Sequence, residues 1–258
     1  MKPTDFSSVR LIAMDLDGTL LNKEKTISPR TLQALEECRR RGIKLAFVTG
    51  RSRKAARQYE EMLRPEGAVF SYGAQIMLQG ETIARRHMSP QVAGRVLAGA
   101  KAAAKIRYQL KDGPYFSSVP MEGCLPMEED APLLQPVEHI ALWDFPENAA
   151  RTLAKKCGCA LTQAVGDRWC NFSARGTGKG PGMGRLMNAL GLEKGQALAF
   201  GDESCDVEFF RICGIGVAME NGDAFTRAHA DYQTENNDCD GIAIFLEKYL
   251  LSMPSNML

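Results

Sequence analysis

Residues 9–20 read Val-Arg-Leu-Ile-Ala-Met-Asp-Leu-Asp-Gly-Thr-Leu, a short apolar run that ends in two carboxylates and a glycine. An apolar run of this length, bounded by polar turn residues, is typical of a buried strand. We therefore expect a strand over residues 9–14 that delivers Asp15 and Asp17 to a loop at its carboxyl end. Taken alone, an Asp-x-Asp pair at such a place fits a simple turn as well as a functional site.

The segments around this strand alternate between helical and strand patterns. Ser28-Pro29 places a helix cap before a proline in the first turn, and Gly42 ends the helix expected at 29–41. The other expected elements are strands at 43–48, 68–71, 197–200 and 215–218 and helices at 53–63 and 207–213. This alternation predicts an α/β fold with a Rossmann-like, doubly wound parallel sheet.

The middle of the chain has a different character. Between residues 84 and 173, an alanine-rich helix (91–105) is followed by short strands, a proline-rich loop (120–136), a second helix (147–157) and further strands. We expect this segment to be an inserted α+β cap domain. The core is then formed by residues 1–83 and 174–258.

Composition limits the classes of function. The 258 residues are 45% hydrophobic and 24% charged, which is ordinary for a globular protein with a full core. The net charge of +1, with interleaved signs, argues against nucleic acid or a membrane as a partner. Eight dispersed cysteines and the lack of an apolar run near the roughly 18 residues of a membrane span favour a cytoplasmic protein with reduced thiols. We expect a monomer or a small homo-oligomer.

Three more polar groups stand where core elements begin or end. They are Thr49-Gly50-Arg51 after the second strand, Lys179 at the start of the helix after the insertion, and the acids of Gly201-Asp202-Glu203-Ser204-Cys205-Asp206. Non-functional interpretations are also available: the first group could be a simple strand-to-helix turn, and the lysine could be solvated. Because the carboxyl ends of parallel strands meet at one sheet edge, the four groups together predict a shared site.

In their residues and in their order along the chain, these motifs resemble those of the haloacid dehalogenase (HAD) superfamily, specifically its Cof-like phosphatases with a type IIB cap. The resemblance covers essentially the whole chain. It extends to late segments typical of that branch, namely Gly216-Val217-Ala218-Met219, Asn221, Ala230-Asp231 and Asp240-Gly241.

The resemblance implies a phosphoric monoester hydrolase that uses Mg²⁺. Asp15 is then the nucleophile that forms an aspartyl-phosphate, and Asp17 is the general acid and base. The metal ligands are Asp15, Asp202 and the main-chain carbonyl of Asp17, with Asp206 acting through water or through another ligand. A cation is needed because a carboxylate and a phosphate dianion about 4 Å apart repel by roughly 8 kcal/mol at an effective dielectric of about 20.

The same resemblance assigns the substrate contacts. Thr49, Gly50 and Lys179 hold the phosphoryl oxygens. The remaining substrate-binding candidates are Arg51, Tyr72 and Asn221. The substrate implied is a small phosphorylated metabolite, and the inserted cap is expected to select its leaving group.

Two positions depart from the pattern of that branch. Cys205 stands where an asparagine is usual, and Tyr72-Gly73 stands where Asn-Gly is usual. The first change either retunes or impairs catalysis, and the second puts a typical sugar-phosphate preference in doubt. We expect Cys205 to have little thiolate character beside two acids. His139, Trp143 and Trp169 are interpreted as structural residues.

Three functions are consistent with the sequence. The first is hydrolysis of a small phosphorylated metabolite, for which the family suggests a sugar phosphate. The second is a sugar phosphomutase of the same superfamily. The third, suggested by the two departures, is a non-catalytic sensor of a phosphorylated ligand.

Overall fold

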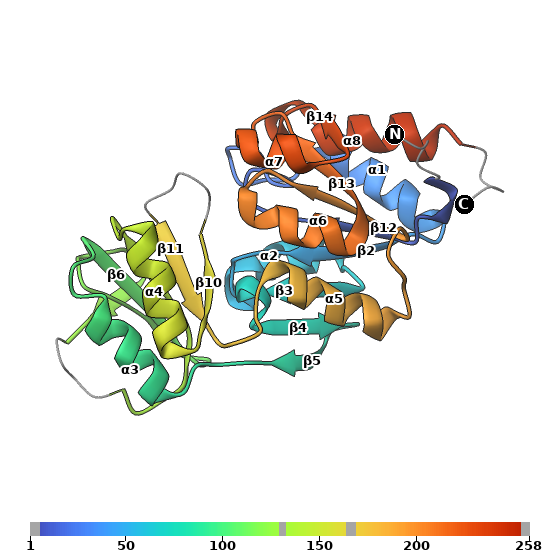
Figure 1. The fold of residues 1–258 in the computed structure, drawn as a ribbon. Helices are drawn as coiled ribbons and strands as arrows, with labels where there is room; N and C mark the ends of the chain where they lie inside the picture. The colour runs from blue at the N-terminus through green and yellow to red at the C-terminus, as the bar shows by residue number, and fades with distance from the viewer. Residues whose placement is uncertain (1–5, 129–132, 164–168, 254–258) are drawn as a thin grey trace. The chain divides into compact units, whose positions relative to one another are not determined.

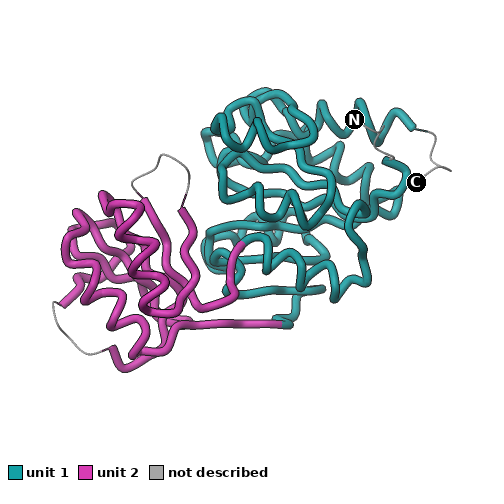
Figure 2. Tube along the Cα trace, in the orientation of Figure 1, with its two compact units in different colours: residues 1–83, 179–258 teal, residues 84–178 magenta. Residues whose placement is uncertain are grey.

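The chain separates into two compact units in a computed structural model that describes residues 6–128, 133–163 and 169–253. Unit 1 consists of residues 1–83 and 179–258, and unit 2 of residues 84–178 (Figure 2). The second junction lies five residues beyond the expected 173/174 boundary. Thr177 explains part of this shift, because its hydroxyl lies 2.7 Å from that of Ser173 and donates to the carbonyl of Ala174 at 2.6 Å.

Unit 1 is built on an eight-stranded sheet in the order β14-β13-β12-β1-β2-β3-β4-β5 (Figure 1). The six parallel strands are β1 (Leu11–Met14), β2 (Lys44–Val48), β3 (Gly67–Phe70), β12 (Ala197–Gly201), β13 (Gly214–Met219) and β14 (Tyr232–Thr234). The sequence analysis missed β14, β4 (Gln75–Leu78), which runs antiparallel to β3, and the edge strand β5 (Glu81–Arg85). The expected doubly wound parallel sheet is confirmed, with an antiparallel extension.

Helices cover both faces of this sheet. They are α1 (Pro29–Arg40), α2 (Arg53–Leu63), α5 (Lys179–Leu190), α6 (Val207–Cys213), α7 (Ala224–His229) and α8 (Gly241–Leu246), the last continued by a π-helical turn at Glu247–Leu251. Helix α1 packs against α8, and α5 against α6. Ile12 and Met14 of β1 belong to the apolar cluster that includes α1 and α8, whereas Leu11 and Ala13, also buried, point to the opposite face.

Unit 2 is a six-stranded sheet in the order β10-β11-β9-β6-β7-β8, with two helices on one face (Figure 1). Its strands are β6 (Lys105–Leu110), β7 (Tyr115–Ser117), β8 (Cys124–Pro126), β9 (Val137–Trp143), β10 (Ala160–Thr162) and β11 (Trp169–Ser173). Its helices are α3 (Pro90–Gly99) and α4 (Glu147–Cys157). The apolar side chains of Ile106, Ile140 and Phe172 join the helices in a second core.

Two expectations for unit 2 were wrong in detail. The helix expected at 91–105 ends at Gly99, because Lys105 already pairs with Trp143 in the sheet. The proline-rich loop contains the short strand β8, and its residues 129–132 lie outside the described residues. None of the helices within the described ranges has the length and apolar character needed to cross a membrane.

Glycines set how closely α5 lies on the sheet of unit 1. A Cβ atom at Gly182 would lie 2.5 Å from Cγ1 of Val69 and 3.1 Å from Cα of Gly73. Two residues further along α5 the surroundings are less crowded, since a Cβ at Gly184 would meet only Cγ2 of Ile212, at 3.9 Å. The first glycine therefore positions the helix that begins at Lys179.

We predict that Gly182→Ala lowers the free energy of unfolding by about 1–3 kcal/mol, because the added methyl group must displace α5. The control Gly184→Ala adds a methyl in ordinary contact and is expected to be neutral or to stabilise by up to ~1 kcal/mol through helix propensity. Urea denaturation of both variants measures the difference. Equal effects in the two variants would show that α5 is not held by this contact.

Candidate active site

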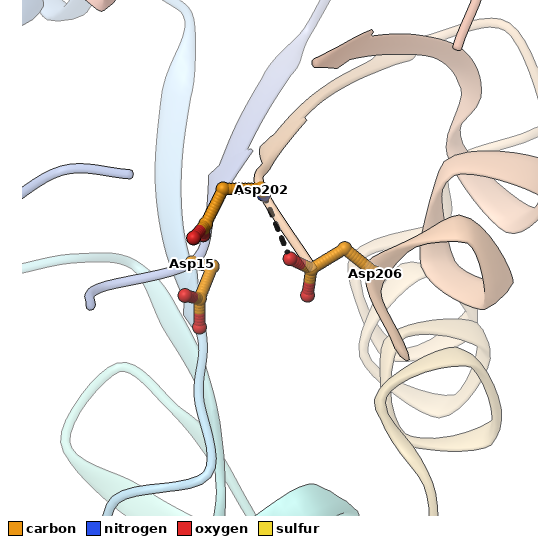
Figure 3. A group of neighbouring side chains, drawn as sticks. All are labelled: Asp15, Asp202 and Asp206. Carbon is orange, nitrogen blue, oxygen red and sulfur yellow. Dashed lines mark hydrogen bonds between the residues drawn. The ribbon is translucent and has the colours of Figure 1, made fainter. Parts of the chain in front are cut away.

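The acids of the site lie at the carboxyl ends of two neighbouring parallel strands. Met14, the last residue of β1, pairs with Phe200 of β12, and the amide of Asp15 donates to the carbonyl of Phe200 at 3.0 Å. Asp15 and Asp202 therefore leave the sheet side by side. Together with Asp206 they form a group in which one carboxylate oxygen of each residue lies within 4.8 Å of the others (Figure 3).

Lys179 places a buried positive charge among these acids. Its ammonium donates to Oδ1 of Asp15 at 2.9 Å and to Oδ1 of Asp206 at 2.5 Å, and the residue is only 4% exposed. Burial alone would lower the pKa of Lys179, but the two carboxylates outweigh it and raise the pKa well above its usual value. Lys179 is therefore charged at neutral pH.

Asp206 uses both of its oxygens to hold this arrangement. Oδ1 accepts from Lys179, while Oδ2 accepts from the backbone amides of Asp202 and Glu203, each at 3.0 Å. Gly201 makes the close approach possible, because a Cβ there would lie 2.5 Å from the Cβ of Asp206. Asp206 thus orients the loop that carries Asp202. These contacts suit an indirect role, in which Asp206 positions a metal ligand, better than direct coordination of the metal.

Among the described residues, side-chain hydrogen bonds reach Oδ1 of Asp15 and Oδ1 of Asp202, so each carboxylate keeps its second oxygen for another ligand. Oδ1 of Asp202 accepts from the hydroxyl of Thr19 at 2.7 Å, and its other oxygen lies against Gly18, where a Cβ would approach to 2.2 Å. The sequence analysis missed Thr19, although it stands inside the first motif. Gly18 also has a φ of +75°. Both the backbone conformation and the lack of space for a side chain therefore favour glycine at this turn.

The charge balance of the group favours a bound cation. Burial raises the pKa of Asp15 well above its usual value, although Lys179 opposes the effect, and Asp206 raises it further. Burial, together with the charge of Asp206, raises the pKa of Asp202 to about 7. Oxygen ligands at this spacing fit Mg²⁺, which commonly takes one or two carboxylates and keeps water or phosphate oxygens as its other ligands. The residues present therefore fit the expected metal.

Asp17 lies apart from this group. Its Oδ2 accepts from Nε of Arg51 and its Oδ1 from Nη2, both at 2.6 Å, and Lys25 adds a third contact at 2.8 Å. Partial burial would raise the pKa of Asp17, but hydrogen bonds from Arg51 and Lys25 dominate and lower it to about 2. The carboxylate is thus ionised in this conformation, and Arg51 pairs with Asp17 rather than lying free for a substrate.

Thr49 and Tyr72 form the next edge of the site. Thr49 is 1% exposed, and its hydroxyl accepts from the backbone amide of Arg51 at 3.1 Å. Tyr72, with a φ of +52°, lays its ring on Gly50, where a Cβ would lie 2.4 Å from the phenol oxygen. Burial raises the pKa of Tyr72 well above its usual value, and Cys205 adds to this effect, so the two departures from the family pattern lie near each other.

Two further predictions concern Cys205 and Asn221. The pKa of the Cys205 thiol is raised well above its usual value, as expected, but burial is a larger cause than the neighbouring acids Asp206 and Glu203. Asn221 donates to the carbonyl of Gly18 at 2.8 Å and accepts from the amide of Asn237 at 3.0 Å. Its amide therefore connects the Asp17-Gly18 turn to the backbone at Asn237, and its contact with substrate stays a prediction.

Comparison with known proteins agrees with this geometry. A family model of haloacid dehalogenase-like hydrolases matches residues 12–116 and 146–246. The chain is 23% identical over 95% of its length to the pyridoxal phosphate phosphatase YbhA of Escherichia coli, all of which is covered. It is 26% identical over 92% of its length to the chloroplastic endoribonuclease YBEY of Arabidopsis thaliana, but it spans only 46% of that protein.

A solved structure of a HAD subclass IIB sugar phosphatase superposes with a TM-score of 0.79 at 20% identity, covering 93% of this chain and 99% of the other. This likeness confirms the predicted fold class, a Rossmann-like HAD core with an inserted α+β unit. Since the family model matches well over half of the chain, and does so across the strands that carry Asp15 and Asp202, the chain belongs to the haloacid dehalogenase-like hydrolases, in the Cof-like phosphatase branch that its motifs resemble.

Proposed function

We propose that this enzyme is a magnesium-dependent phosphomonoesterase that hydrolyses a small phosphorylated metabolite through an aspartyl-phosphate on Asp15. The observation that carries the proposal is the buried group in which Lys179 bonds Asp15 and Asp206 while Asp15 and Asp202 each keep an oxygen available. The names of the relatives, a pyridoxal phosphate phosphatase and a sugar phosphatase, support a small phosphorylated substrate.

Asp15 attacks the phosphorus atom, and the bond from phosphorus to the leaving oxygen breaks. Lys179 holds the nucleophile through Oδ1 and supplies positive charge beside the phosphoryl oxygens. The hydroxyl of Thr49 is the second contact for those oxygens. A bound Mg²⁺ would be held by Asp15 and Asp202, while Asp206 would orient the loop that carries Asp202. The cation would offset the negative charge of the phosphate.

Asp17 must change partners to take part. A general acid has to carry a proton, whereas Asp17 is ionised and held at both oxygens by Arg51. We infer that an anionic group of the substrate draws the guanidinium of Arg51 away, which lets the pKa of Asp17 rise. Asp17 then takes up a proton from solvent, gives it to the leaving oxygen, and later takes one from the water that attacks the phosphoaspartate.

One observation favours a second candidate, a phosphate-ligand sensor without turnover. The ring of Tyr72 lies on Gly50, and both Tyr72 and Cys205 interact electrostatically with Lys179. These side chains occupy space next to the lysine that would hold the phosphate. The sensor binds a phosphorylated ligand but releases no phosphate.

Asp15→Asn is predicted to lower kcat for p-nitrophenyl phosphate by at least about a thousandfold, because an amide cannot form the phosphoaspartate. The variant should stay folded, since the substitution removes one of several crowded carboxylates. Phosphate release is measured with Mg²⁺, and folding is followed by thermal denaturation. Turnover at the wild-type rate in the folded variant would exclude Asp15 as nucleophile. A wild-type protein that binds phosphate esters without releasing phosphate would support the sensor.

Mg²⁺ is predicted to raise the melting temperature, and more strongly at pH 8 than at pH 6. The pKa of Asp202 is about 7 without metal, so a proton competes with the cation below that pH and is absent above it. Asp202→Asn should abolish most of the Mg²⁺ shift. Glu61→Gln, which changes an exposed acid on α2, is the matched control and should keep the full shift. A shift that is larger at pH 6 would contradict the assignment.

A further inference from the structure

The loop at residues 202–206, which we call the metal loop, is held by a second carboxylate besides that of Asp206. Asp223 lies beyond β13, the strand next to β12 in the sheet of unit 1. Its Oδ2 accepts from the backbone amide of Ser204 at 2.7 Å, and its own backbone amide donates to the carbonyl of Asp202 at 2.9 Å. Asp206 accepts from the two amides before that of Ser204. The two acids therefore bind the three consecutive backbone amides that follow β12.

Asp223 is itself fixed in place. Its Oδ1 accepts from the amide of Thr226 at 2.7 Å, so the side chain also caps α7. The preceding residue, Gly222, donates to the carbonyl of Met219, the last residue of β13, at 3.0 Å. A Cβ at Gly222 would lie 2.9 Å from the carbonyl oxygen of Asp202, so the chain can pass this close only with glycine there. The turn after β13 therefore brings Asp223 against the metal loop.

A helix cap accounts for only one of the side-chain contacts of Asp223. An N-cap needs one acceptor oxygen, and the oxygen that bonds Thr226 supplies it. The other oxygen bonds an amide nineteen residues earlier in the chain, outside α7. Serine or asparagine would cap the helix about equally well, but neither offers a second carboxylate oxygen. The second contact therefore indicates a role in the metal loop.

The backbone of the metal loop decides where the carboxylate of Asp202 points. Thr19 holds Oδ1 of that carboxylate at 2.7 Å, while Asp206 and Asp223 hold the amide and the carbonyl of the same residue. The second carboxylate oxygen of Asp202 is the one left for Mg²⁺. Because Mg²⁺ demands near-octahedral geometry with ligand distances of about 2.0–2.1 Å, a small displacement of this backbone weakens its binding.

We propose that Asp223 is a positioning residue of the magnesium site, which holds the metal loop so that Asp202 can bind the ion. The proposal rests on the function proposed above, because it concerns the same cation. In this role Asp223 touches neither the metal nor the substrate. It acts through the carbonyl of Asp202 and the amide of Ser204, and no sequence motif indicated it.

The test is the affinity of the protein for Mg²⁺, measured by titration calorimetry without substrate. In Asp223→Asn one oxygen remains to cap α7, but the nitrogen that replaces the other oxygen is a donor and cannot accept from Ser204. The variant should bind Mg²⁺ about tenfold to a hundredfold more weakly, the usual effect of changing a residue that orients a metal ligand. Wild-type affinity in this variant would overturn the proposal.

Two controls separate positioning from charge and from stability. Glu220→Gln removes the same charge from an exposed side chain of the adjoining turn, whose carboxylate accepts from Asn236. It should bind Mg²⁺ within about twofold of the wild type, because solvent and salt screen an exposed charge. Ser89→Ala removes the cap of α3 in unit 2, so it should lower the melting temperature and leave the Mg²⁺ affinity unchanged. A loss of affinity in either control equal to that in Asp223→Asn would refute positioning.

The amide of Ser204 reports on the metal loop directly. Its hydrogen bond to Asp223 should slow hydrogen exchange in the metal-free wild type. Asp223→Asn should speed exchange at this amide by about tenfold, as expected for the loss of one hydrogen bond to a charged group, and leave the amide of Leu198 in β12 unchanged. Nuclear magnetic resonance measures both amides. Equal exchange of the Ser204 amide in the two proteins would show that Asp223 does not hold the loop.

The outcomes keep this proposal separate from the phosphatase function. If the wild type binds Mg²⁺ but releases no phosphate, the proposed catalysis fails, while weaker Mg²⁺ binding by Asp223→Asn still supports the positioning role. If the wild type is a Mg²⁺-dependent phosphatase and Asp223→Asn has the same Mg²⁺ dependence, only the positioning role fails. A wild type that binds no Mg²⁺ overturns both.

Discussion

The contact of the buried Lys179 ammonium with Asp15 and Asp206 is the interaction on which the site depends. Three carboxylates within 4.8 Å of one another repel strongly where water is scarce, and this one cation connects two of them. Breaking a buried pair of this kind leaves an uncompensated charge, which costs far more than the loss of a surface ion pair. The lysine therefore holds the structure together in addition to its proposed contact with phosphate.

Glycines make this concentration of charge possible. Gly182 allows α5 to lie close to β3, and this fixes where the first residue of the helix, Lys179, enters the site. Gly18 and Gly201 leave room for Asp202 and Asp206, whose oxygens or carbons would overlap a Cβ at either position. Close backbone approach and electrostatics thus act together, because acids can be held this near to one another only where no side chain separates them.

The sequence predicted the parts of the site that follow from topology. Asp15 and Asp202 end adjacent parallel strands, so their meeting is a consequence of the strand order. The direction of a long side chain does not follow from strand order, and so the pairing of Arg51 with Asp17 was not foreseen. The antiparallel strand β4 was missed for a related reason: Tyr72 at positive φ turns the chain back, and no local motif marks a tyrosine for that conformation.

The buried polar atoms of unit 2 show where periodicity alone misleads. Alternation in β9 and β11 correctly places Ile140 and Phe172 toward the helices, and by the same rule it places His139 and Asn171 on the other face. Alternation predicts that this face is solvated, yet Asn171 has no exposed surface, and its side-chain amide has no hydrogen-bond partner within the part of the chain that the structure describes. Stability alone would favour an apolar residue there. Whether a strand face is solvated depends on what covers it, and that follows from the tertiary structure rather than from the alternation within the strand.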